Sequence, residues 1–378
     1  MQKIIAFVLM VLLWSSCKQA ATDQSQNNNM PNELSVKHAQ GFTIEQHDGY
    51  SVLEILSPWP DSEQAFRYAL IKTKRPADSL QFDAMVTVPV QSLVVTSTTH
   101  IPSLEMLEVQ DRLVGFPFAD YVSSPKTRAL IEANKVKELG GSQEINTEVL
   151  IELSPELVVG YGVDGTNKNL NLIEKAGIPV IYNGDWMEQT PLGKAEWLLF
   201  FGALFDKQEK ASQLFNQIES DYNQVKEIAK NAKSKPTVLS GAMYKDIWYL
   251  PKGTSWAAAF IADANGDYLY KDSQGTGSLA LSLESVLVKA QNAQYWIGPG
   301  QFSSLSQMEQ ANKAYASIAA FNQKNVFSFT TKVGPTGGVI YYELAPNRPD
   351  LVLKDIVKIL HPELLPDYNL YFFSLLSE

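Results

Sequence analysis

Aromatic and polar side chains in the loops that follow predicted strands are the residues of this chain best suited to bind a ligand. Large, flat aromatic faces fit a bulky organic molecule because they stack on it and bury its apolar surface. Tyr121, Trp186, Tyr244 and Trp248 are the strongest candidates, since each lies in such a loop. The other residues predicted to line the ligand-binding cleft formed by these loops are Thr99, His100, Phe118, Tyr161, Lys245 and Lys332. The alternative for each aromatic residue is that it only packs against neighbouring parts of the protein and does not contact a ligand.

His100 and three basic residues allow more specific chemistry. His100 could supply an axial nitrogen to a metal complex, although a loop histidine more commonly makes hydrogen bonds. Lys245, Lys332 and Arg348 could neutralise an anionic chelate, or could simply lie in solvent. The chain has 4 histidines, and the other three lie outside the predicted cleft loops. A site for a free metal ion needs several converging ligands. We therefore predict no protein-held metal and no cofactor.

Sequence motifs and charge argue against several functional classes. The chain contains no GxSxG, no Walker A sequence, no HExxH, and no GxGxxG after a predicted strand. The formal net charge is −10, and removal of a signal segment containing Lys3 would change it to about −11. A negative balance of this size disfavours nucleic acid as a partner. We predict a binding protein and not an enzyme.

The sequence predicts two α/β lobes, and these would bring the candidate loops together. From Ser92 onward, short apolar strands such as residues 92–97 and 157–162 alternate with helices. That pattern is typical of mainly parallel sheets covered by helices. A long amphipathic helix over residues 206–233 separates two such series. Residues 42–90 precede them and are β-rich, with a turn at His47-Asp48-Gly49 that predicts an antiparallel hairpin extension.

The N-terminus predicts export and a lipid anchor. Lys3 precedes the apolar run Ile4–Trp14, which is too short for a membrane span of about 20 residues. Cys17 is the only cysteine and stands where a lipid-accepting thiol would lie. Simple cleavage that leaves this cysteine unmodified is the alternative. The predicted organisation is a lipoprotein signal peptide at 1–16, a flexible tether at 17–35, an N-terminal α/β lobe with the hairpin extension at 36–190, linker helices at 191–233, and a C-terminal α/β lobe at 234–378.

The two halves share a local pattern that contains a glutamate. Asn146 stands two residues before Glu148, and Ser282 stands two residues before Glu284. In each case a predicted helix follows, and then a strand. For one glutamate alone, helix capping and complementation of the helix dipole would be a sufficient explanation. The matching positions in two similar lobes favour a paired role.

The segments SLVVTSTTHIPSLEMLEVQDRLVGFPFADYV, EINTEVLIELSPELVVGYG and IEKAGIPVIY, together with the long joining helix, resemble the class III, or helical-backbone, periplasmic binding proteins of ABC importers. The resemblance covers the chain from about Ser92 to the C-terminus. It implies two lobes bridged by one rigid helix, with a ligand held in the cleft between them. It also implies that Glu148 and Glu284 are exposed carboxylates that dock on arginines of the importer's permease subunits.

The resemblance also gives expectations about cargo and location. It implies a monomer in the bacterial cell envelope, on the periplasmic face, anchored to a membrane through lipid on Cys17. The expected cargo is a small-molecule metal chelate, and an iron complex such as a ferric siderophore or haem ranks first. Cobalamin or another corrinoid is the alternative of the same class. A periplasmic enzyme or a ligand sensor built on this fold is a more distant alternative.

Overall fold

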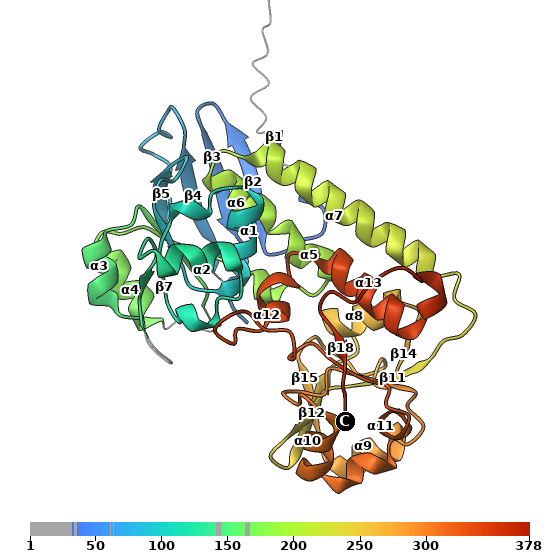
Figure 1. Ribbon diagram of the computed structural model, residues 1–378. Helices are drawn as coiled ribbons and strands as arrows, with labels where there is room; N and C mark the ends of the chain where they lie inside the picture. Colours follow the sequence, from blue (N-terminus) through green and yellow to red (C-terminus); the bar gives the residue numbers. More distant parts are fainter. Residues whose placement is uncertain (1–31, 34–35, 61, 63, 141–144, 163–166) are drawn as a thin grey trace, which may run out of the picture. The chain divides into compact units, whose positions relative to one another are not determined.

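The computed structural model describes residues 32–378 except 34–35, 61, 63, 141–144 and 163–166 (Figure 1). The predicted signal peptide, Cys17 and most of the predicted tether lie outside the described residues. Strand β1 (Asn32–Glu33) lies within the span predicted as a tether, 17–35. It pairs antiparallel with β2, so this end of the predicted tether belongs to a sheet. Within the described part, no helix combines the length and the apolar character needed to cross a membrane.

The β-rich segment forms a five-stranded sheet in the order β1-β2-β3-β4-β5. The predicted hairpin is confirmed, since His47 pairs with Tyr50 around a turn in which Gly49 has a φ of +83°. A Cβ at Gly49 would lie 2.5 Å from the Cβ of Lys74, so only glycine fits. The expectation of a purely antiparallel extension is wrong at its last strand, because β5 pairs parallel to β4. The strands are β2 (Phe42–His47), β3 (Tyr50–Ile55), β4 (Phe66–Ile71) and β5 (Ala84–Thr87).

The N-lobe is built on a parallel sheet in the order β10-β9-β6-β7-β8. Its central strands are continuous runs of buried aliphatic residues, as expected for strands covered on both faces. The strands are β6 (Leu93–Val95), β7 (Leu113–Phe116), β8 (Lys137–Glu138), β9 (Leu157–Gly160) and β10 (Val180–Tyr182). The helices are α1 (Ile101–Met106), α2 (Pro125–Glu132), α3 (Thr147–Leu153) and α4 (Lys168–Lys175).

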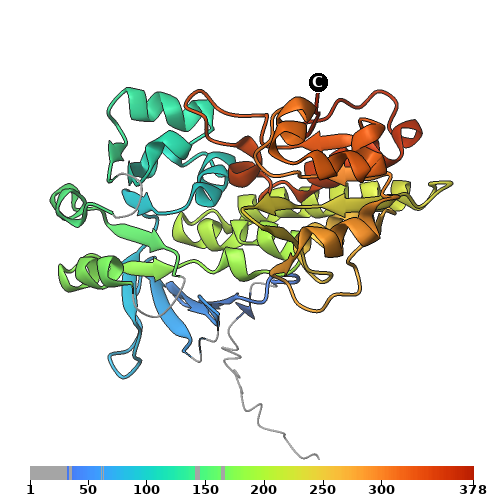
Figure 2. The same ribbon diagram turned by 90° about the horizontal axis from the view of Figure 1, so that it is seen from below.

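Three helices connect the lobes: α5 (Pro191–Glu196), α6 (Leu198–Leu204) and α7 (Gln208–Ala229). Helix α7 has 22 residues and is therefore about 33 Å long. In Figure 2 these helices, in yellow-green, lie between elements of the N-lobe and elements of the C-lobe. The first half of α7 buries Phe215 in the N-lobe core, and its second half buries Tyr222 and Val225 in the C-lobe core. One continuous helix thus belongs to both cores, which confirms the predicted long joining helix.

The C-lobe contains a main sheet in the order β14-β11-β16-β17-β18 and a small sheet in the order β12-β13-β15. The small antiparallel sheet was not expected from the sequence. The strands are β11 (Thr237–Ser240), β12 (Ala242–Tyr244), β13 (Ile247–Pro251), β14 (Asp267–Tyr268), β15 (Ser278–Leu281), β16 (Tyr295–Ile297), β17 (Val326–Ser328) and β18 (Ser374–Leu375). The helices are α8 (Trp256–Asp263), α9 (Leu283–Ala290), α10 (Leu305–Ala311), α11 (Ala319–Asn322), α12 (Ile340–Leu344) and α13 (Pro349–Leu360).

Helix α12 and its flanking residues make a second connection between the lobes. The Glu343 carboxylate accepts a hydrogen bond from the backbone N–H of Ser123 at 2.7 Å. The Asn347 side chain accepts from the Ser103 hydroxyl at 2.7 Å and donates to the Thr99 carbonyl at 2.8 Å. These contacts join residues more than 200 positions apart in the sequence. They tie α12 and the turn that follows it to the N-lobe.

Candidate functional site

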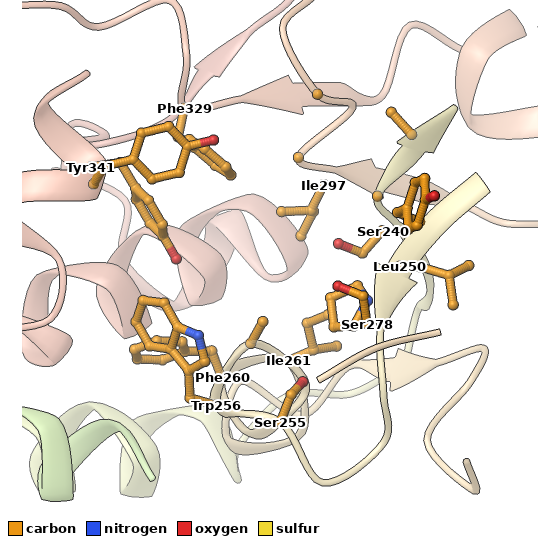
Figure 3. A pocket seen from close by; sticks show the side chains of 18 of the residues that line it. Ser240, Leu250, Ser255, Trp256, Phe260, Ile261, Ser278, Ile297, Phe329 and Tyr341 are labelled. Carbon is orange, nitrogen blue, oxygen red and sulfur yellow. The ribbon is translucent and has the colours of Figure 1, made fainter. Parts of the chain in front are cut away.

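A cavity of about 740 Å³ lies in the C-lobe near the strand ends. It begins beyond the carboxyl ends of β11 and β16, where Ser240 and Ile297 line it. In parallel α/β sheets this edge is where ligands bind. Figure 3 shows Trp256, Phe260 and Ile261 of α8 on one side of the cavity. The aromatic residues Phe329 and Tyr341 lie next to them, with the ring centre of Tyr341 6.2 Å from that of Trp256.

The small sheet β12-β13-β15 forms another wall of this cavity through residues such as Tyr244, Tyr249 and Ser278. Gly241 permits the sharp change of direction from β11 into β12, with a φ of +79°. A Cβ there would lie 2.0 Å from the Tyr249 carbonyl oxygen, so a side chain would force β13 away. The wall therefore depends on a glycine between the two sheets.

Two further cavities lie between the lobes, and each shares lining residues with the first. One, of about 500 Å³, is lined by Phe118, Tyr121 and Tyr161 of the N-lobe and by Gln301 and Tyr342 of the C-lobe. Gln301 and Tyr342 also line the C-lobe cavity, so the two share a wall.

The smallest cavity, of about 290 Å³, is lined by Thr99, Trp186 and Lys194 from one side and by Trp256 from the other. Trp256 is shared with the C-lobe cavity and Tyr161 with the second cavity. The three cavities adjoin one another and include surfaces of both lobes, and the group of three is called the branched cleft below.

A buried ionic group lies at the corner of the smallest cavity. Lys194 of α5 donates hydrogen bonds from Nζ to the carbonyls of Asp185 at 3.0 Å and Trp186 at 3.1 Å. Its ammonium lies 5.3 Å from the centre of the Trp256 ring. Burial lowers the pKa of Lys194, and the nearby carboxylates of Asp185 and Glu188 oppose that shift. The Asp185 carboxylate is held by the Thr99 hydroxyl at 2.9 Å. Lys194 is therefore a cation at the edge of the cleft, and two of its N–H groups already donate to backbone carbonyls.

Six of the predicted cleft residues line the branched cleft: Thr99, Phe118, Tyr121, Tyr161, Trp186 and Tyr244. Tyr121 and Tyr244 are 63% and 67% exposed, so much of their ring surface is free for a ligand. Lys245 is exposed and places its amine 5.5 Å from the ring centre of Tyr244, but it lines none of these three cavities.

The structure corrects the placement of three predicted residues. His100 is fully buried against Phe201 of α6, with ring centres 5.5 Å apart, and neither of its ring nitrogens has a hydrogen-bond partner among the described residues. Burial lowers its pKa, so it is a neutral core histidine. Trp248 is fully buried and stacks on Trp296 at 5.1 Å. Lys332 points away from the cleft and donates to the carbonyls of Leu370 and Tyr371.

The residues that the sequence reasoning missed come mainly from the inner wall of the C-lobe cavity. Trp256 and Phe260 belong to the apolar helix α8 and lie outside the loops in which the sequence analysis placed the ligand-binding residues. Phe329 directly follows β17, and its ring stacks on Tyr341 at 4.2 Å. The available signal was position, since Phe329 follows a strand as the predicted loop residues do. No group of three or more His, Cys, Asp or Glu side chains suited to a metal ion occurs in the described parts of the chain.

Glu148 and Glu284 occupy equivalent positions on the two lobes. Each is the second residue of its helix, α3 or α9, and each is exposed. Asn146 caps α3 by accepting from the Val149 N–H, and Ser282 caps α9 by accepting from the Ser285 N–H. Hydrogen bonds from its own backbone N–H and from the Ser282 hydroxyl lower the pKa of Glu284. Neither glutamate contributes the cap itself, so both carboxylates are available to a partner.

Two α/β lobes, one helix shared by both cores, and a cleft lined from both sides define a two-lobed ligand-binding protein. The chain belongs to the periplasmic binding protein family, which matches residues 93–333. A protein of Methanocaldococcus jannaschii described as an uncharacterized lipoprotein is 28% identical over 305 residues, or 76% of this chain and 69% of the relative.

Solved structures show the same fold. A possible iron-binding (periplasmic solute-binding) protein from Staphylococcus epidermidis superposes with a TM-score of 0.56 at 16% identity, over 72% of this chain and 99% of the other. A periplasmic haem-binding protein of Vibrio cholerae superposes with a TM-score of 0.54 at 15% identity, over 70% of this chain and 99% of the other. The predicted family and fold class, with two lobes joined by a long helix, are confirmed.

Proposed function

We propose that this protein is the substrate-binding component of an ABC importer and captures a bulky organic metal chelate between its lobes. The observation that carries the proposal is the branched cleft, whose largest cavity is about 740 Å³ and whose walls come from both lobes. Volumes of this order suit a small organic molecule, and aromatic walls suit one with large flat faces. An iron complex ranks first as cargo, and a corrinoid is the alternative of the same class.

The chemistry of the cleft favours a metal that arrives already chelated. Tyr341 is a phenol that could ligate iron only as phenolate, and burial raises its pKa well above the ordinary value. His100 faces the core and cannot supply an axial nitrogen from its observed position. Neither Tyr341 nor His100 is therefore a ready metal ligand, and affinity would come chiefly from contact between the cleft and the organic chelator.

Delivery would use the two exposed glutamates. One carboxylate on each lobe can meet arginines of two permease subunits, and exposed charges of this kind set orientation and association rate more than affinity. Capture, docking and release into the permease would follow without turnover of the ligand. A lipid on Cys17 would keep the protein beside the importer in the cell envelope.

Charge reversal at both docking positions tests this function. We expect the variant E148R/E284R to bind the cargo as the unmodified protein does and to lose uptake into cells that carry the cognate importer. The variant E132R/E309R is the matched control, because it makes the same charge change at exposed residues of both lobes and should transport normally. Cargo is identified first by native mass spectrometry and absorbance of protein purified from its own cells. Normal uptake by E148R/E284R would contradict the docking proposal.

A further inference from the structure

We propose that the 740 Å³ cavity of the C-lobe is a side pocket that receives an uncharged, largely apolar part of the ligand. It would thereby select against ligands that carry an anionic group on that part. The inference rests on the proposed binding function and specifies the class of ligand. It starts from the composition of the wall, because none of the described residues that line this cavity is charged.

The polar groups at the deep end of the pocket are already paired. The Trp248 indole donates to the Ser240 carbonyl at 3.3 Å, and the Trp296 indole donates to the Gly241 carbonyl at 2.8 Å. The Ser255 hydroxyl accepts from the Ala258 N–H as the cap of α8. The two buried tryptophans therefore occupy the carbonyl oxygens at the end of β11 that could otherwise accept from a ligand. What remains toward the cavity is mainly aromatic and aliphatic surface.

The aromatic part of the wall is held in place by its own packing. Tyr341 stacks on Phe329, and Phe373 meets the Phe329 ring edge-on with centres 5.7 Å apart. The ring centre of Trp256 lies 6.2 Å from that of Tyr341. Rings that support one another in this way present fixed flat faces, which favour an aromatic or alicyclic group of the ligand.

A charged group would be poorly tolerated in this pocket. Moving an ion from water into an apolar site is unfavourable unless a counter-charge or hydrogen bonds replace its hydration. Two lysines lie against rings of this wall from outside the lining. Lys194 lies against Trp256 in the neighbouring cavity and donates to two backbone carbonyls. Lys245 is exposed, with its amine 5.5 Å from the ring centre of Tyr244. An acidic group of the ligand is therefore better placed at the mouth, near Lys194, than inside the pocket.

Two fluorescent probes with the same anilinonaphthalene ring system test this selection. N-phenyl-1-naphthylamine is uncharged, and 1-anilinonaphthalene-8-sulfonate adds one sulfonate. Titration of the full-length protein should show at least about tenfold tighter binding of the neutral probe, a factor that corresponds to about 1.4 kcal/mol. Equal affinity, or tighter binding of the sulfonate, would overturn the proposal.

Substitutions that fill the pocket test whether the probe binds inside it. Ala257 lines the cavity, and Ala259 lies two positions further along α8, outside the lining. We expect A257L and A257F to weaken binding of the neutral probe progressively, by at least about tenfold for phenylalanine, while A259F binds it as the unmodified protein does. Circular dichroism establishes that each variant is folded, and the smaller leucine keeps the test valid if phenylalanine disturbs α8. Unchanged binding in a folded A257L and A257F would overturn the proposal.

The probes need neither the permease nor Glu148 and Glu284. A failure of the probe experiment therefore leaves the transport proposal standing. Conversely, normal uptake by E148R/E284R would contradict docking without changing the affinity for the neutral probe.

Discussion

Glu343 makes folding stability depend on pH, and a single substitution can isolate its effect. The residue is only 3% exposed, and its carboxylate accepts the Ser123 N–H across the two lobes. Burial raises the pKa of Glu343 to about 7, hydrogen bonds from Ser123 oppose the shift, and the nearby Glu105 carboxylate adds to it. Glu105 is itself held by the hydroxyls of Ser124 and Thr127. The substitution E343Q removes the titration and keeps a side chain of the same shape.

The direction of the effect follows from the proton balance. In the unfolded chain Glu343 has its ordinary pKa of 4.5, and in the folded protein its pKa is about 7. Between these values the folded state holds a proton that the unfolded state has released. The free energy of unfolding therefore falls as the pH rises through this window. A shift of about 2.5 units corresponds to a loss of about 3 kcal/mol by pH 8, relative to pH 4.

Urea unfolding at several pH values between 4 and 8 measures this loss. The stability difference between the unmodified protein and E343Q should change by about 3 kcal/mol across the range, with the unmodified protein losing stability relative to E343Q as the pH rises. E132Q is the control, because Glu132 is exposed and should leave the pH profile unchanged. A difference between the two proteins that stays constant with pH would refute the reasoning.

Three further substitutions probe the contact between the lobes and the wall of the pocket. N347A removes the amide that makes one hydrogen bond with Ser103 and one with Thr99, and it leaves the Ser103 hydroxyl buried without that partner. Thermal or urea unfolding should therefore show a loss of about 1–3 kcal/mol in the free energy of unfolding; an unchanged stability would contradict this. W256L should weaken binding of the neutral naphthylamine probe and leave the fold intact. W248L should chiefly lower the free energy of unfolding, because Trp248 is buried on Trp296. Loss of stability in W256L together with loss of probe binding in a stable W248L would contradict these roles.

The fold was largely predictable because its signals are local. The runs LVV and LVVG form buried parallel strands, and the apolar stripe of residues 206–233 forms a helix that packs on both cores. Glu148 and Glu284 were found from capping patterns, which depend on only a few neighbouring residues. Information of this kind is present in the sequence itself.

The cleft was less predictable because burial of a loop residue is decided by distant parts of the chain. Trp248 and Tyr249 are adjacent, and side chains alternate between the two faces of a strand. Strand β13 pairs with β12 and β15, so Trp248 is buried while Tyr249 is 41% exposed and lines the cavity. The sequence alone does not show how β13 is paired, and so it does not show which of the two rings faces the cavity. His100 is buried for a similar reason, since Phe201 of α6 covers it.

Helix α12 brings the pocket, the cleft and the lobe contact together within three consecutive residues. Tyr341 belongs to the aromatic wall of the C-lobe cavity, and Tyr342 lines both that cavity and the cavity between the lobes. Glu343 is hydrogen-bonded to the N-lobe. A displacement of the backbone of this five-residue helix would move Tyr341 and Glu343 together. If a ligand in the proposed side pocket shifts that backbone, we expect the hydrogen bond between Glu343 and Ser123 to change with it, and we expect α7, which is embedded in both cores, to limit how far the lobes respond.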